Sequence, residues 1–161
     1  MQHECYGNNN HTAGLPLEEL SLEISTDRAR LNVDLIHAFL AESYWAAGRS
    51  RAAVEKSISH SLCFGAYIRG EQVAFARLVT DKATFGYLAD VFVVPEWRGR
   101  GISKQLLQQI LDHPDLADIS LLLRTRDAHE LYKRFGFRAC KDPERFMTLV
   151  NRHTRGSNPD Q

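Results

Sequence analysis

The most informative part of the 161-residue sequence reads Val91-Phe92-Val93-Val94-Pro95-Glu96-Trp97-Arg98-Gly99-Arg100-Gly101-Ile102-Ser103. It joins an apolar run, residues 84–94, to a helical apolar pattern that ends near Leu111. The run is apolar on both faces, as in strands that are covered on both sides, and Pro95 ends it. The sequence therefore predicts a central strand, a glycine-rich loop and an amphipathic helix in succession.

The glycine-rich loop, residues 98–103, has the chemistry of a phosphate site. The first N–H groups of a helix have no partner inside it and carry the positive end of its dipole. Gly99 and Gly101 allow an anion to approach the backbone closely. The side chains of Arg98 and Arg100 either help to hold the anion or are solvated surface arginines. We expect a pyrophosphate at the backbone N–H groups of this loop.

Two common phosphate loops are excluded. The chain has no Gly-x-x-x-x-Gly-Lys-Ser/Thr sequence, so it is not a P-loop nucleoside triphosphatase. Lys104 stands where a Gly-x-Gly-x-x-Gly dinucleotide loop needs its third glycine. The loop therefore belongs to another class of phosphate binder.

Strand and helix patterns alternate on both sides of this stretch. Strands are predicted at residues 20–24, 61–68, 72–80, 84–94 and 119–123, with a closing pair at 137–139 and 145–150. Helices are predicted at 29–41, from a Ser50 cap to about Ser59, and from an Asp127 cap with Glu130 in a capping box to Gly136, while residues 98–111 are a loop running into a helix. Hairpins are antiparallel and strand-helix-strand units are parallel, so we expect an α/β domain with a mixed sheet. We place it at residues 19–151, between flexible tails at 1–18 and 152–161.

Composition and charge exclude several classes of function. Twenty basic residues balance twenty acidic ones, so the chain lacks the overall positive charge that nucleic acids or anionic membranes attract. No apolar run approaches the roughly 18 residues of a membrane-spanning helix. Three cysteines, Cys5, Cys63 and Cys140, fit no zinc spacing. We expect reduced thiols, no metal, no nucleic-acid or membrane partner, and a cytoplasmic location.

Two motifs resemble those of one family. Residues 91–103 resemble the acetyl-CoA signature of the GNAT superfamily of N-acetyltransferases, Gln/Arg-x-x-Gly-x-Gly/Ala after a strand, with Ser103 in the last small position. Residues 127–137 resemble its second hallmark, Ala-x-x-Leu-Tyr-x-x-x-Gly-Phe, with Thr125 where the family often has Asn. The two occur in the family's order, and the resemblance covers about residues 20–150. It implies a GNAT-type acyltransferase fold, in which a central mixed sheet is flanked by helices, with acetyl-CoA as co-substrate.

The resemblance also implies the residues that contact acetyl-CoA. In the family the pantetheine arm adds to the strand edge, so the main chains of Phe92 and Val94, with Val93 between them, are expected to pair with it. One of these N–H groups would polarise the thioester carbonyl. The remaining predicted contacts come from the loop and the second hallmark, namely Arg98, Gly99, Arg100, Gly101, Ile102, Ser103 and Asp127.

Two residues are predicted to take part in the chemistry. Tyr132 matches the family tyrosine that protonates the leaving thiolate. Transfer from a phenol of pKa near 10 to a thiolate of pKa near 8.5 is uphill by roughly 2 kcal/mol, so a strong hydrogen bond is the alternative to full transfer, and core packing is a third. Asp90 is predicted as the base, because a carboxylate in a central strand is costly without a partner or a task. A structural hydrogen bond to a neighbouring strand or helix end is the alternative.

The acceptor side is less defined. Tyr44 and Trp45 lie between the first two predicted helices, where GNAT folds often form the wall of the acceptor site, and they either stack on an amine or pack internally. Cys63 lies in an apolar strand and is predicted to be buried, which favours direct transfer over an acetyl-cysteine route. Two functions are open: acetyl transfer to a small-molecule, amino-acid or peptide amine, or a CoA-binding sensor without chemistry. Many relatives are dimers, so a homodimer is compatible with the resemblance.

Overall fold

The computed structural model describes residues 21–149, and the predicted tails at 1–18 and 152–161 lie outside this range. Five strands form one sheet in chain order. They are β1 (Leu22–Ser25), β2 (Leu62–Ile68), β3 (Glu71–Thr80), β4 (Phe85–Val93) and β5 (Ser120–Leu123). The first three pairings are antiparallel and β4 pairs with β5 in parallel. The predicted mixed α/β sheet is confirmed.

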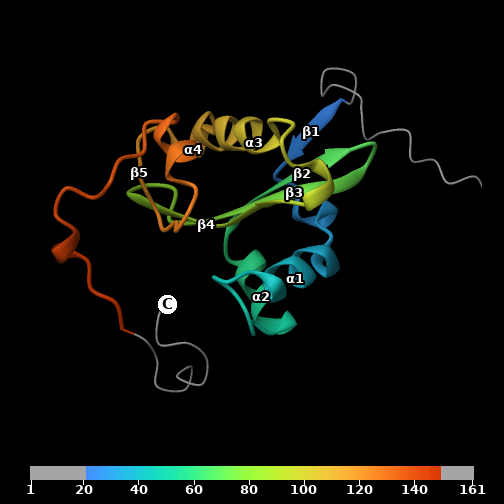
Figure 1. Cartoon of the computed structure of the whole chain (residues 1–161), viewed down its shortest axis with the longest axis horizontal. Coiled ribbons are helices and arrows are strands. Elements are labelled where there is room, and N and C mark those ends of the chain that lie inside the picture. Colours follow the sequence, from blue (N-terminus) through green and yellow to red (C-terminus); the bar gives the residue numbers. More distant parts are fainter. Residues whose placement is uncertain (1–20, 150–161) are drawn as a thin grey trace, which may run out of the picture.

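Helices cover both faces of this sheet. Figure 1 shows α1 (Val33–Glu42) and α2 (Arg51–Ser59) on one face, and α3 (Ile102–Leu111) and α4 (His129–Lys133) on the other. Short 3-10 turns occur at Arg28–Arg30, Pro95–Trp97, Pro114–Leu116 and Pro143–Arg145. None of the helices within residues 21–149 has both the length and the hydrophobicity of a membrane span.

Side-chain caps set where the first two helices begin. The Ser50 hydroxyl accepts the Ala53 N–H, as predicted for α2. The first helix begins at Val33 rather than at residue 29, because the Asn32 side chain accepts the Leu35 N–H and residues 28–30 form a separate turn. A cap of this kind is worth about 1 kcal/mol. The α1–α2 layer is therefore divided by the segment 43–50.

The apolar stripe of α3 fixes the glycine-rich loop against the sheet. Ile102, Leu106, Leu107 and Ile110 are all at most 1% exposed, and α3 contacts β1, β2, β3 and β4. Burying side chains of this size contributes about 1.5–3 kcal/mol each. The first helical residue is itself part of the core, so the start of α3 has little freedom to move away from β4.

The predicted closing strands, 137–139 and 145–150, are wrong for the described chain. Residues 137–142 form no strand, Pro143–Arg145 is a 3-10 turn, and 146–149 have no regular structure, while Val150 lies outside the described range. Phe146, Met147 and Leu149 are exposed, and Figure 1 shows this segment running away from the sheet. Alternating apolar residues give a segment the pattern of a strand, but no neighbouring strand pairs with it here.

The start of α4 also differs from the prediction. Its N-cap is Ala128, without a side-chain cap, and the Ala128 N–H donates to Thr125 Oγ1 at 3.0 Å. Asp127 is therefore not the cap, because the helix begins at His129 and its N-cap position falls on Ala128. Glu130 forms an ion pair with Lys133 at 2.6 Å instead of a capping box. The predicted end is confirmed, since Gly136 follows the helix with φ +85°.

A buried hydroxyl in β2 gives a test of the packing. Tyr67 is 2% exposed and its hydroxyl has no hydrogen-bond partner in the described part of the chain. An unsatisfied buried polar group costs about 1–3 kcal/mol, so we expect Tyr67→Phe to raise the free energy of unfolding by about 1 kcal/mol, measured by urea denaturation.

The control for this variant is Gly65→Ala. An added Cβ would lie 2.4 Å from the Tyr67 hydroxyl oxygen, so we expect this variant to lose stability. A loss of stability in Tyr67→Phe as well would mean that the hydroxyl has a partner, and would contradict the packing described here.

Candidate active site

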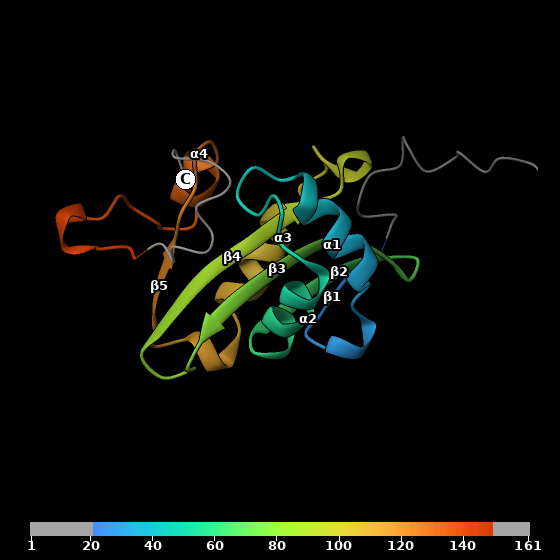
Figure 2. The ribbon, with the colours of Figure 1, turned by 90° about the horizontal axis from the view of Figure 1, so that it is seen from below.

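The parallel ladder between β4 and β5 is short. It pairs Phe85 with Ser120 and continues only to Leu88 with Leu123, whereas β4 runs on to Val93 beside β3. Figure 2 shows β4 and β5 separating beyond their paired ends. Within residues 21–149, the second half of β4 therefore has a strand neighbour on one edge only.

The register decides which main-chain groups face the open edge. The Val94 N–H donates to the Val73 carbonyl at 2.9 Å. Every second residue of an antiparallel ladder turns its main-chain groups to the same neighbour, so Phe92, opposite Phe75, turns to β3 as well. Val91 and Val93 are left to face the open edge. The register thus turns Phe92 and Val94, whose main chains were predicted to contact a ligand, toward β3. Sequence alternation assigns side chains to faces but leaves strand edges undefined.

The arginine that follows β4 folds back on the strand. Arg98 Nε donates to the Val93 carbonyl at 3.0 Å, and its guanidinium lies 5.9 Å from the centre of the Phe39 ring. Arg100 lies 4.8 Å from the centre of the Trp97 ring. Both arginines therefore contact protein groups, and both still add positive charge around the loop.

The loop and the start of α3 form an anion site built from the backbone. Gly99 and Gly101 have φ of +76° and +83°, the left-handed region that favours glycine. Gly101 is the N-cap and has no side chain to satisfy the helix. The N–H groups of Lys104 and Gln105 reach the Gly101 carbonyl at 3.0 and 3.2 Å. The N–H groups of Ile102 and Ser103, which precede them, have no partner inside the helix, which suits an anion at this point.

Tyr132 lies in α4, beyond the diverging strand β5. It is 9% exposed and its ring meets Phe137 edge-on, with 5.7 Å between ring centres. It lines a cavity of about 290 Å³ together with residues 121–125 of β5 and the following loop. Burial raises the pKa of Tyr132 to about 12, with smaller contributions from Tyr44 and Asp127. The phenol is therefore protonated at neutral pH and can act as a hydrogen-bond donor.

A row of aromatic rings connects β4 with the segment between α1 and α2. The Phe92 ring stacks on Phe39 with 3.9 Å between centres, and Phe39 lies 6.5 Å from Trp45. Tyr44 meets Trp45 edge-on at 5.0 Å, and the Arg126 guanidinium lies 3.8 Å from the centre of the Tyr44 ring. Of the two residues predicted for the acceptor side, Tyr44 thus contacts the segment between β5 and α4, and Trp45 contacts Tyr44 and Phe39.

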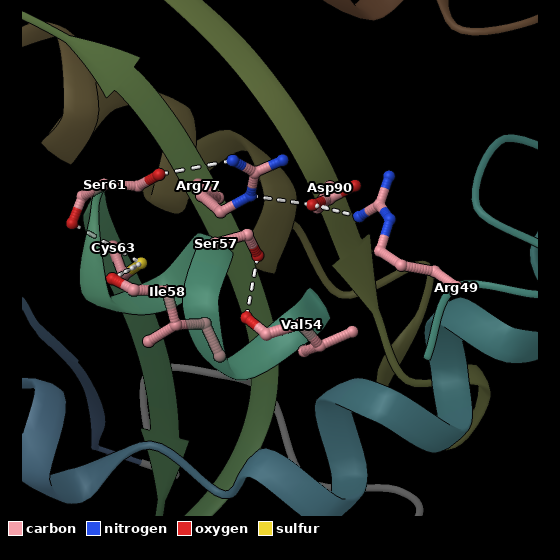
Figure 3. Close-up of polar contacts among 8 residues, drawn as sticks. All are labelled: Arg49, Val54, Ser57, Ile58, Ser61, Cys63, Arg77 and Asp90. Atoms are coloured by element: carbon pink, nitrogen blue, oxygen red, sulfur yellow. Dashed lines mark hydrogen bonds and ion pairs between the residues drawn. The ribbon is translucent and has the colours of Figure 1, made fainter. Parts of the chain in front are cut away.

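Asp90 is buried between two arginines. Its residue exposure is 5%, and its Oδ2 accepts hydrogen bonds from Arg49 Nη1 and Arg77 Nε, both at 2.8 Å (Figure 3). Arg77 belongs to β3, which gives Asp90 the structural bond to a neighbouring strand that the sequence left open. The predicted role as a base is not tested by this geometry and stays a prediction.

Sequence reasoning missed several residues of this site. Arg49 and Arg77 pair with Asp90, Arg126 covers Tyr44, and Phe39 joins the aromatic row. A buried carboxylate signals that a cation must lie nearby, but the chain has 20 lysines and arginines. Only the three-dimensional fold selects which of them reach Asp90.

Comparison with known proteins gives consistent matches. Residues 59–139 match the family model described as "Acetyltransferase (GNAT) domain". The Gibberella zeae protein named "Putative acetyltransferase FG08082" is 32% identical over 143 residues, and the match covers 74% of this chain and 80% of that protein. A crystal structure from Xanthomonas campestris pv. campestris, described as "a putative acetyltransferase belonging to the gnat family", is 44% identical with a TM-score of 0.80, and the match covers 84% of this chain and 97% of that one.

A more distant structure shares the fold. A GNAT family acetyltransferase from Elizabethkingia anophelis, solved with acetyl-CoA bound, is 17% identical with a TM-score of 0.55. The match covers 74% of this chain and 76% of that one.

The reactivity of the two described cysteines tests whether Cys63 belongs to the core. Cys63 is 1% exposed, its Sγ donates to the Ile58 carbonyl at 3.7 Å, and burial raises the pKa of its thiol to about 11. Because the thiolate is the reactive form, we expect iodoacetamide at pH 7.5 to modify the exposed Cys140 and to leave Cys63 unmodified until the protein is denatured. Peptide mass spectrometry measures both. Equal rates at the two cysteines in the native protein would contradict the assignment of Cys63 to the core.

Proposed function

This chain belongs to the GNAT family of acetyl-CoA-dependent acetyltransferases, and we propose that it transfers the acetyl group directly to a primary amine of a small molecule, an amino acid or a peptide. One observation carries the proposal. The short β4–β5 ladder leaves an open strand edge, with the anion site of α3 after it and Tyr132 beyond β5. They would receive the pantetheine arm, the pyrophosphate and the leaving thiolate of acetyl-CoA.

The open edge of β4 is proposed as the site of the pantetheine arm. Val91 and Val93 face it, and the Val93 carbonyl is already held by Arg98. The Val93 N–H is therefore our proposed donor to the thioester carbonyl oxygen, where negative charge develops during acyl transfer. The pyrophosphate of CoA would lie at the N–H groups of residues 99–103, supported by the positive end of the α3 dipole.

Tyr132 is proposed to stabilise the leaving thiolate. Moving a proton from a phenol of pKa about 12 to a thiolate of pKa near 8.5 is uphill by about 5 kcal/mol. This is more than the value expected for an ordinary tyrosine, because burial disfavours the phenolate. Of the predicted alternatives, the raised pKa favours a strong hydrogen bond to the thiolate over complete proton transfer.

The amine has to be neutral to attack. At pH 7, deprotonation costs about 1 kcal/mol for an α-amine and about 4.6 kcal/mol for a lysine-like amine. Asp90 Oδ2 already accepts two hydrogen bonds from guanidinium groups, so a base role for Asp90 would have to use Oδ1. We therefore propose α-amines as the first acceptors to test.

The test is release of free CoA thiol from acetyl-CoA in the presence of an amine panel: trialanine, L-glutamate, L-lysine, spermidine and ethanolamine. We expect Tyr132→Phe to lower kcat roughly 100-fold while the KM for acetyl-CoA stays within about threefold, because the hydrogen bond to sulfur forms only as the thiolate leaves. The control is Tyr87→Phe, in the part of β4 that is paired with β5, for which we expect kcat near that of the unmodified protein.

Two outcomes would contradict the proposal. Unchanged kcat in Tyr132→Phe would remove this residue from the chemistry. Binding of CoA without turnover of any amine in the panel would favour a CoA-binding sensor.

A further inference from the structure

We propose that Asp90 is a positioning residue which, through Arg49, fixes the segment between α1 and α2 that carries Tyr44 and Trp45. This segment, residues 43–50, is called the acceptor loop below. The link to Arg49 is a property of the fold, whereas its effect on an acceptor rests on the function proposed above.

Asp90 is the residue at which β4 leaves regular pairing. Arg77 lies opposite Ala89 and Phe75 lies opposite Phe92, so β4 has one more residue than β3 between these pairs. Asp90 itself has φ +53°, a left-handed conformation in which aspartate is among the few residues enriched. Bulges of this kind redirect a side chain away from the ladder, and here the carboxylate points to Arg49 and Arg77 (Figure 3).

The two arginines have different roles at the carboxylate. The Arg77 side chain is 12% exposed, and its second guanidinium contact is to Ser61 Oγ at 3.2 Å. It therefore neutralises Asp90 from within the sheet, as a buried carboxylate requires. Arg49 comes from outside the sheet, and its side chain is 27% exposed. One cation already pairs with Asp90, so the second serves mainly to attach the segment that carries it.

Hydrogen bonds do little to fix the acceptor loop relative to the sheet, apart from the one that Arg49 makes. Its backbone hydrogen bonds are local, from the Ala46 N–H to the Ser43 carbonyl at 3.3 Å and from the Arg49 N–H to the Ala46 carbonyl at 3.0 Å. The bond between Arg49 and Asp90 instead joins residues 41 positions apart. Local bonds shape a loop without fixing it relative to a sheet. The position of this loop therefore depends on the ion pair, on the ring contacts of Tyr44 and Trp45, and on the buried Ala46.

The acceptor loop reaches the site through Tyr44. The Arg126 guanidinium, from the segment before α4, lies 3.8 Å from the centre of the Tyr44 ring, and Trp45 lies near Phe39, which stacks on Phe92. Loss of the bond between Arg49 and Asp90 would therefore loosen the part of the acceptor side that Tyr44 and Trp45 form. The anion site at the start of α3 would keep its shape, because it is held by the buried face of α3.

The first test needs no substrate. In Arg49→Gln we expect amide hydrogen exchange in residues 43–50 to become at least about tenfold faster, while exchange in α3 stays unchanged. Asp90 keeps Arg77 as a partner in this variant, so the fold is retained, and Arg49→Lys should restore part of the protection. The matched control is Arg51→Gln, which removes an exposed arginine that pairs with Asp34 and Glu55 instead of Asp90. It should leave amide exchange in residues 43–50 unchanged. Unchanged exchange in Arg49→Gln would overturn the proposal.

The second test separates positioning from base catalysis. With the panel amine that gives the highest turnover, Arg49→Gln should raise the acceptor KM about tenfold, while the KM for acetyl-CoA and the pH dependence of kcat/KM stay the same. Asp90→Asn should accelerate exchange in the acceptor loop in the same way. If Asp90→Asn instead abolishes the acidic limb of the pH profile without changing loop exchange, Asp90 is a base and the proposal is overturned. If no amine is acetylated, the proposed function fails, and the exchange result alone decides whether Asp90 fixes the loop.

Discussion

The parallel pairing between β4 and β5 ends after Leu88 and Leu123, and the features of the site follow from this. Beyond that point β4 is supported only by β3 among the described strands, so Val91 and Val93 have main-chain groups that no described strand occupies. In chain order the N-terminus of α3 follows β4, and Tyr132 of α4 follows β5. A sheet paired along its full length would leave no edge for an extended thioester arm.

The bulge at Asp90 lies in the half of β4 that pairs with β3 but not with β5. A left-handed residue and a buried carboxylate each carry a free-energy cost, and two guanidinium groups offset the second of them. In return the bulge places a fixed negative charge on the side of the sheet that carries α1 and α2. The cofactor side and the acceptor side of the site are thus built on one strand, with main-chain groups serving the first and a side chain serving the second.

The sequence predicted the parts that depend on local chemistry. Glycines at 99 and 101 and the apolar stripe of α3 define a loop and helix whose conformations follow from those residues alone, and the same is true of the Ser50 cap. It did not predict features set by register or distant partners. The edge toward which Val94 turns its N–H depends on β3, and the arginines at Asp90 come from two other segments. Residues 145–149 of the expected last strand pair with no strand in the described part of the chain.

The most direct test of the account is a titration of ¹⁵N-labelled protein with CoA, followed by the chemical shifts of backbone amides. We expect the largest changes at Val91, Val93 and residues 99–103, because these N–H groups face the proposed ligand. Changes at Phe92 and Val94 should be smaller, since the register of β4 turns these N–H groups toward β3. Saturating CoA that left residues 91–103 unperturbed, or that shifted Phe92 and Val94 more than Val91 and Val93, would contradict the claim that the open edge of β4 receives the cofactor.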